Sequence, residues 1–189
     1  STLNTLETQI IEKLQEQAIN TMDKIDRLLF ERFADIKVLA SDALIVSEGS
    51  TPLQITKRLI DYRNTYKTYI SLSFYDLDRV RIADTSGLHL GEQHRMTEYF
   101  KKALEGEVSA ASDIYIDEGL NTPVIYFASP VKNRKAEIFG VVAARMPAMS
   151  LAYITREVGT TEAAKGIQID LVNRDGLLLY SNHNQKGIL

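Results

Sequence analysis

Residues 69–84 read Tyr69-Ile70-Ser71-Leu72-Ser73-Phe74-Tyr75-Asp76-Leu77-Asp78-Arg79-Val80-Arg81-Ile82-Ala83-Asp84. In the first half of this stretch apolar side chains alternate with serines, and such a period of two is typical of a half-buried β-strand. An acidic turn at residues 76–79 follows, and residues 80–84 then resume the extended pattern. Two such runs joined by a short turn predict an antiparallel β-hairpin.

More strands and helices follow this hairpin along the chain. Strands are predicted at residues 111–117, 123–131 and 138–144, with turns at 118–121 and 132–135. Helices are predicted at residues 97–104 and 150–158, and a last hairpin at residues 167–172 and 177–180. Because short turns join consecutive strands, we expect an α+β fold whose antiparallel sheet has about five strands and is flanked by helices.

The N-terminal quarter of the chain has a different pattern. Residues 1–48 contain neither Gly nor Pro, and their apolar side chains recur every three or four positions. This period predicts one continuous helix from Leu3 to Leu44, on the order of 70 Å long. One domain cannot cover so long an apolar stripe, so we expect it to pack partly on the sheet and partly on a neighbour or second copy. Thr51 and Pro52 then fit the start of a second helix.

Composition excludes several classes of protein. The chain has 189 residues, 22 Lys and Arg against 25 Asp and Glu, and no Cys. The near-neutral charge argues against a nucleic-acid binder, and the lack of Cys excludes disulfides and thiolate metal sites. No apolar run approaches the ~18 residues that span a bilayer. A binding module or an enzyme remains.

Catalytic motifs are missing. The histidines His89, His94 and His183 are scattered, and the sequence has no zinc-protease, nucleophile-elbow or phosphate-loop motif. We therefore expect no catalysis, no metal and no cofactor. Tyrosine is more informative, because its apolar ring with a polar tip suits a pocket for a small polar molecule. The chain has nine tyrosines, and Tyr75, Tyr99, Tyr115 and Tyr126 all fall on the predicted sheet or its short helix.

Five segments in a fixed order resemble a known family. They are Phe74-Tyr75-Asp76-Leu77-Asp78-Arg79-Val80-Arg81-Ile82-Ala83, Tyr99-Phe100-Lys101-Lys102-Ala103-Leu104-Glu105-Gly106, Ser112-Asp113-Ile114-Tyr115-Ile116-Asp117, Val124-Ile125-Tyr126-Phe127-Ala128-Ser129-Pro130-Val131 and Phe139-Gly140-Val141-Val142. Together they resemble the double Cache domains, the extracytoplasmic PAS-like sensor domains of chemoreceptors and sensor histidine kinases. The resemblance implies a signalling helix at residues 1–48, a membrane-distal sensor domain with a PAS-like sheet at 49–159, and the start of a membrane-proximal subdomain at 160–189.

The resemblance also implies a ligand site on the sheet. In amino-acid-sensing members an Arg-x-Trp-Tyr run and a Tyr-x-Asp hold the ligand, and a late Asp helps to bind its ammonium group. Here Tyr115 and Asp117 match Tyr-x-Asp and Tyr99 occupies the Trp position, whereas Thr97 replaces the Arg and Arg145 the late Asp. A guanidinium suits a carboxylate rather than an ammonium group.

We therefore expect Arg145 to hold a small carboxylate, with Tyr99, Tyr115, Tyr126 and Asp117 as hydrogen-bonding neighbours and Thr97 adding a hydroxyl. In the alternative, Arg145 points outward or pairs with Asp117 or Asp113.

These patterns predict the extracytoplasmic sensing module of a transmembrane histidine kinase or methyl-accepting chemoreceptor. We expect a homodimer in the full-length receptor and a membrane attachment through flanking segments. Ligand binding would shift the population of two conformations and alter the long helix. A helix-mediated dimerisation module without a ligand is the alternative, and a small enzyme with carboxylates at Asp113 and Asp117 is a third possibility.

Overall fold

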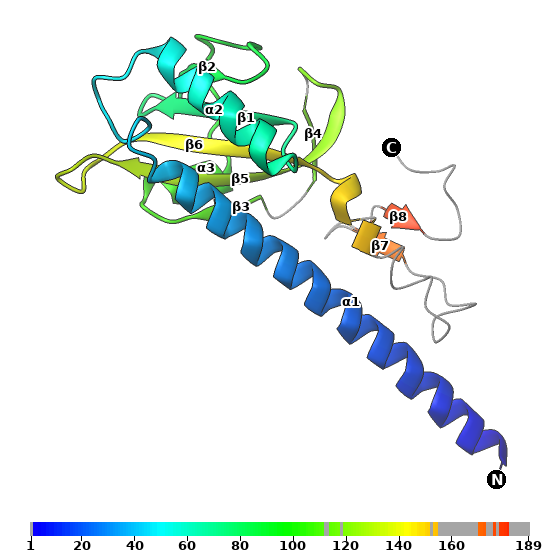
Figure 1. Ribbon diagram of the computed structural model, residues 1–189. Helices are drawn as coiled ribbons and strands as arrows, with labels where there is room; N and C mark the ends of the chain where they lie inside the picture. Colours follow the sequence, from blue (N-terminus) through cyan, green and yellow to red (C-terminus); the bar gives the residue numbers. More distant parts are fainter. Residues whose placement is uncertain are drawn as a thin grey trace. The chain divides into compact units, whose positions relative to one another are not determined.

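The predicted hairpin lies at one edge of an antiparallel sheet in the computed structural model (Figure 1). The structure describes residues 2–111, 114–117, 119–151, 153–154, 170–172, 176 and 178–181. Strand β1 (Ser71–Asp76) pairs with β2 (Arg81–Asp84) on one side and with β6 (Ile138–Pro147) on the other. The strand order is β2-β1-β6-β5-β3, with β4 pairing to β5, so the predicted α+β fold with a PAS-like sheet is confirmed.

The sheet has six strands where about five were predicted. The run predicted at residues 111–117 contributes β4 (Tyr115–Asp117), while β3 (Ser109–Ala110) lies just before it. Both pair antiparallel with β5 (Thr122–Lys132), which is long enough to bind two short strands in succession. Residues 112 and 113, and with them Asp113, lie outside the described residues.

By its internal contacts the chain divides into two units, residues 31–147 and residues 1–30 with 148–189. The first unit contains the six-stranded sheet. In the second, β7 (Asp170–Val172) and β8 (Leu178–Ser181) form the predicted last hairpin. Most of the helix predicted at residues 150–158 and the turn at 173–175 lie outside the described residues.

The long helix is present and unbroken. Helix α1 spans Thr2–Ala40 and ends before Leu44, where the sequence predicted its end. The hydroxyl of Ser41 donates to a carbonyl one turn back, and Asp42 Oδ1 accepts the Leu44 backbone N–H at 3.0 Å. These side-chain bonds offer the backbone a turn in place of another helical turn. None of the described helices is long and apolar enough to cross a membrane.

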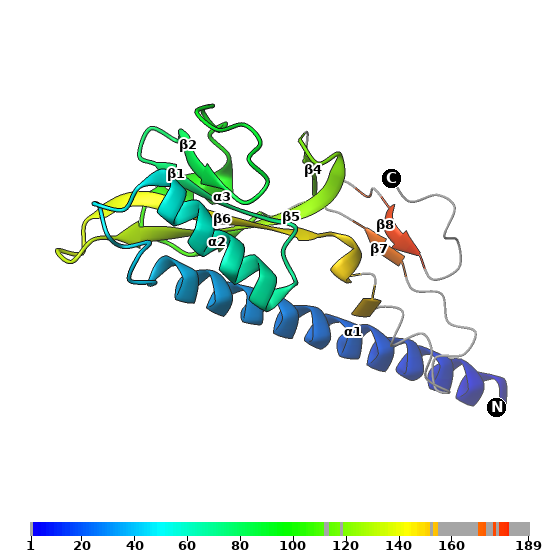
Figure 2. The same cartoon turned by 45° about the horizontal axis from the view of Figure 1, so that its top comes forward.

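Helix α2 (Pro52–Tyr66) begins as the sequence predicted. Thr51 is its N-cap and forms a capping box with Gln54, and Pro52 occupies the first helical turn. The helix lies beside the end of α1 (Figures 1 and 2). Arg58 on α2 binds Asp42 there, with 2.6 Å between Nη2 and Oδ2.

The two faces of the sheet are covered by different helices. Phe33 near the end of α1 meets Phe127 of β5 edge to face, with ring centroids 5.9 Å apart. Because strand side chains alternate, Tyr126 points to the opposite face. On that face the short helix α3 (Glu98–Leu104) buries Tyr99 and Phe100 in an apolar cluster with Tyr126. The candidate site therefore lies on the α3 face.

Candidate ligand-binding site

A pocket of about 340 Å³ opens on the α3 face of the sheet. Its walls come from β1, β2, the loop at residues 86–97, α3, β4 and β5. Half of the fourteen lining residues are aromatic or hydroxyl-bearing, and four carry charged side chains. This is the composition expected of a site that orients a small polar molecule.

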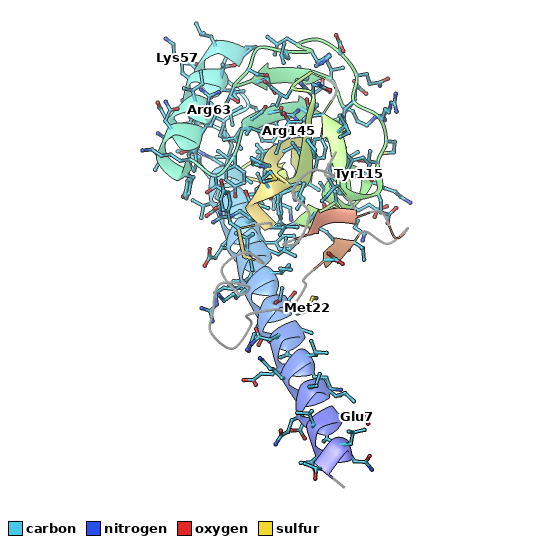
Figure 3. The ribbon with its side chains drawn as sticks, turned by 90° about the vertical axis from the view of Figure 1, so that its right-hand side faces the viewer. Glu7, Met22, Lys57, Arg63, Tyr115 and Arg145 are labelled. Atoms are coloured by element: carbon cyan, nitrogen blue, oxygen red, sulfur yellow. The ribbon has the colours of Figure 1, made fainter. Side chains whose placement is uncertain are left out.

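Five residues predicted from the sequence line this pocket, namely Thr97, Tyr99, Tyr115, Asp117 and Tyr126. Arg145 does not line it. Figure 3 shows Arg145 within the sheet and Tyr115 nearer its edge. Tyr115 is 40% exposed whereas Arg145 is 1% exposed, so the sheet covers the guanidinium.

Arg145 is enclosed by partners. Its Nε lies 2.9 Å from Asp117 Oδ2, and its Nη1 lies 3.3 Å from Asp84 Oδ2. Nη1 also donates to the hydroxyls of Ser71 and Ser73, and Nη2 donates to the Tyr75 hydroxyl at 3.2 Å. Burial disfavours the charge, but the surrounding tyrosine and aspartate side chains outweigh burial and raise the pKa of Arg145. The pairing with Asp117, left open by the sequence, is what the structure contains.

Strand register brings this network together. Ser71 pairs across the ladder with Arg145, which pairs in turn with Tyr126. On the other side of β1, Ser73 pairs with Asp84. Directly paired residues point to the same face, so these polar side chains converge beneath the pocket.

Asp84 is the buried carboxylate of the network. Its Oδ1 accepts the Ser86 backbone N–H at 2.7 Å, and its Oδ2 accepts the Ser73 hydroxyl as well as Arg145. Burial raises the pKa of Asp84, but hydrogen bonds from Ser73 and Ser86 and the Arg145 charge outweigh it, so the pKa is lowered. Asp84 is thus an ionised partner for the guanidinium.

Asp117 is held from four directions. Its Oδ1 accepts the backbone N–H groups of Gly119 and Leu120 at 3.1 and 3.0 Å. Its Oδ2 accepts the Tyr126 hydroxyl at 2.8 Å and faces Arg145. This carboxylate thus accepts three hydrogen bonds, and its fourth neighbour, Arg145 Nε, is an ion-pair contact without hydrogen-bond geometry.

His94 lies among the aromatic rings of the pocket. Its Nε2 is 3.0 Å from the Tyr99 hydroxyl. Burial, followed by the charges of Arg81, Arg145 and Arg79, lowers the pKa of His94 to about 4, while Asp117 has a smaller opposing effect. His94 is therefore neutral near pH 7, and the electrostatic potential at its ring is positive.

Arg81 supplies a guanidinium on the pocket wall itself. Its Nε donates to the Tyr75 hydroxyl at 3.0 Å and its Nη1 to the Leu88 carbonyl at 3.0 Å. Nη1 also lies 3.6 Å from Asp84 Oδ2. Arg81 therefore joins the network beneath the pocket to the loop that forms its wall.

Two loops meet at the pocket. A Cβ added to Gly119 would lie 2.8 Å from His89 Nε2, so any other residue here would require the His89 side chain to shift. His89 Nδ1 in turn lies 2.8 Å from Glu92 Oε2. The loop at residues 86–97 is thereby held against the turn that follows β4.

Sequence reasoning missed Arg81, Asp84 and His94 as members of the site. A signal was present: Ser71 and Ser73 alternate with Leu72 in a strand that is buried on both faces. Polar side chains facing a covered sheet surface need partners, and the charged residues of the next strand could have been assigned to them. Within the residues that the structure describes, no group of three metal-ligating side chains is found.

Comparisons with known proteins agree with this fold. No protein-family model and no curated protein matches the sequence. Among solved structures, the ligand-binding domain of Campylobacter jejuni chemoreceptor Tlp3 in complex with L-valine is 14% identical, with a TM-score of 0.71, covering 94% of this chain and 73% of that one.

The ligand-binding domain of Pseudomonas fluorescens chemoreceptor CtaA in complex with L-isoleucine is 19% identical, with a TM-score of 0.70, covering 95% and 71%. The Escherichia coli DcuS sensor domain is 18% identical, with a TM-score of 0.57, covering 69% and 96%. The chain therefore has the fold of Cache-type sensor domains, as the sequence resemblance predicted.

Proposed function

We propose that this chain is the extracytoplasmic small-molecule-sensing module of a transmembrane signalling receptor. The observation that carries the proposal is the pocket of about 340 Å³, whose aromatic and hydroxyl-bearing walls stand over a buried, charge-compensated network. The pocket lies on a sheet shared with solved sensor domains, two of which were determined with bound amino acids. A pocket of this size with a few placed polar groups suits the binding of a small molecule.

We propose a carboxylate-bearing molecule as the ligand. The lowered pKa of His94 reports burial and a positive potential from nearby arginines, which favours an anion. Arg81 is the guanidinium on the wall, and Arg145 lies behind it with a hydrogen bond to the same Tyr75 hydroxyl. Arg145 would thus act on the ligand through Tyr75 and Asp117.

Signalling would proceed through the end of α1. The hydroxyl of Tyr69 donates to Asp35 of α1 at 2.9 Å, and the next residue, Ile70, donates its backbone N–H to the Arg145 carbonyl at 2.9 Å. A ligand that favours one arrangement of the network would shift the population of α1 conformations. In the full-length receptor we expect a homodimer, with membrane attachment through flanking segments.

Thermal-shift screening tests the proposal. A ligand at 100 times its dissociation constant adds about 2.7 kcal/mol to the free energy of unfolding. Thr97→Tyr should fill the pocket and abolish the shift, whereas Thr65→Tyr, on the exposed side of α2, should preserve it. A shift that survives Thr97→Tyr would place the site elsewhere. The absence of a shift with any carboxylate, amide, amine or sugar would favour a dimerisation module without a ligand.

A further inference from the structure

The hydroxyl of Tyr75 has an unbalanced set of hydrogen bonds. It accepts one bond from Arg81 Nε at 3.0 Å and another from Arg145 Nη2 at 3.2 Å. Guanidinium groups can only donate, so both lone pairs of the phenol oxygen are used. The hydroxyl proton finds no acceptor within hydrogen-bond distance among the described residues. Tyr75 is 1% exposed and lines the pocket, so its proton is available only to a pocket occupant.

Thr97 adds a second hydroxyl of the same kind. It is the N-cap residue of α3, where a threonine hydroxyl ordinarily accepts a backbone N–H, yet it makes no such bond. Its Oγ1 is buried and makes no hydrogen bond of acceptable geometry among the described residues, although it lies close enough to the Tyr99 hydroxyl to oppose, in small part, the rise in the pKa of Tyr99 that burial causes. A buried polar atom without a partner is costly, so a ligand atom is the natural partner for this hydroxyl on the pocket wall.

Asp117, the buried carboxylate of the pocket, already has partners, unlike the hydroxyl protons of Tyr75 and Thr97. Asp117 already faces two backbone N–H groups, the Tyr126 hydroxyl and Arg145 Nε. An ammonium group brings three donors, and at Asp117 it would have to compete with three existing hydrogen bonds and with the positive charge of Arg145. The buried part of the pocket therefore offers unused hydroxyl donors, while its other lining carboxylate, Glu92, is 68% exposed and has Oε2 2.8 Å from His89 Nδ1.

We propose that Tyr75 is a specificity-determining residue, whose hydroxyl donates its proton to a carboxylate of the ligand with Thr97 as a second donor. This inference rests on the proposed function. It further states that the pocket selects against an ammonium group, because Arg81 and Arg145 fix the Tyr75 oxygen as an acceptor and leave only its proton for the ligand. Phosphate and sulfate share the acceptor chemistry of a carboxylate, so the test must separate them.

The test measures binding of matched probes by calorimetry: propionate, succinate, propionamide, propylamine and inorganic phosphate. Tyr75→Phe keeps the ring and removes the hydroxyl, and Tyr62→Phe on α2 is the matched control. Hydrogen bonds to charged groups contribute about 1.5–3 kcal/mol, so Tyr75→Phe should weaken carboxylate binding roughly ten- to hundredfold. Its effect on propionamide should be smaller, and Tyr62→Phe should change neither affinity.

Tyr75→Phe also removes the acceptor of two guanidiniums, so Thr97→Val provides a second variant, one that removes no hydrogen bond of acceptable geometry. It should weaken carboxylate binding while preserving the melting temperature, with Thr65→Val as its control. Carboxylate affinity within threefold of wild type in both variants would overturn the inference and leave the sensing function standing. Preferential binding of propylamine or phosphate would also overturn the inference about Tyr75. If none of the probes bound, the inference and the proposed sensing function would both be overturned.

Discussion

Replacing Asp84 by Asn leaves two buried guanidiniums facing an uncharged amide. Asp84 Oδ2 lies 3.3 Å from Arg145 Nη1 and 3.6 Å from Arg81 Nη1, and the Asp84 side chain is fully buried. Removing one member of a buried ion pair costs about 3–5 kcal/mol because an uncompensated charge remains. Arg145 keeps Asp117 at 2.9 Å, so we expect the lower end, about 3 kcal/mol.

This loss is a large part of the about 5–15 kcal/mol that holds a typical domain folded. At about 2–4 °C per kcal/mol for a chain of this size, the melting temperature should fall by about 6–12 °C. Urea unfolding followed by circular dichroism measures the change directly. Asp78→Asn is the control, since Asp78 is exposed in the turn between β1 and β2 and should change stability by less than about 0.5 kcal/mol.

The pH dependence gives an independent check. Because the folded pKa of Asp84 is lowered, its contribution is complete above the ordinary value of 3.8 and is lost as the pH falls through the folded value. Asp84→Asn should therefore flatten the acid side of the stability profile. A loss below about 1 kcal/mol with an unchanged denaturant slope would refute the claim that Asp84 compensates the buried arginines.

Three further predictions follow from burial and packing. NMR titration should find His94 neutral down to about pH 4, because burial and then nearby arginines lower its pKa. The free energy of unfolding should therefore fall as the pH drops from about 6.5 towards 4. A measured pKa of His94 above 6 would contradict this prediction. Gly140→Ala would put a Cβ 2.5 Å from Phe74 Cζ, so unfolding experiments should find a loss of about 1–3 kcal/mol, and an unchanged midpoint would refute that contact. Phe127→Ala should lower the free energy of unfolding by about 3–5 kcal/mol, because the side chain is fully buried. Phe30→Ala, at a side chain 74% exposed, should change it very little in the isolated chain. Equal losses for the two variants would contradict the difference in their burial.

Much of the fold could be predicted because its signals are local. Alternation around Leu72 and Phe74 marks β1, and the capping residues Thr51 and Pro52 mark the start of α2. Element ends were less accurate, as at Ala40, because side-chain bonds from residues just beyond the helix decide where it stops. The division between β3 and β4 depends on pairing with β5, which no local pattern contains.

The candidate site also contains residues that local motifs predict and residues that only the strand pairing brings together. Tyr99, Tyr115 and Asp117 follow from short motifs, and the structure brings them together around one pocket. The enclosure of Arg145 depends on which residue of β1 stands opposite it, and a shift of one residue would turn every side chain to the other face. The register between strands is set by the assembled sheet, so the ion pair between Arg145 and Asp84 could not be predicted from the sequence.

The enclosure of Arg145 also constrains how the ligand preference could evolve. Amino-acid-sensing members of the family it resembles have an acid at the position of Arg145. Changing Arg145 to Asp here would put three carboxylates within one buried network, because Asp84 and Asp117 already flank the site from two other strands. Such a chain would lose stability before it gained an ammonium site, so no single substitution leads there. Among descendants of this sequence, an acid at position 145 should therefore appear only together with a change at position 84 or 117.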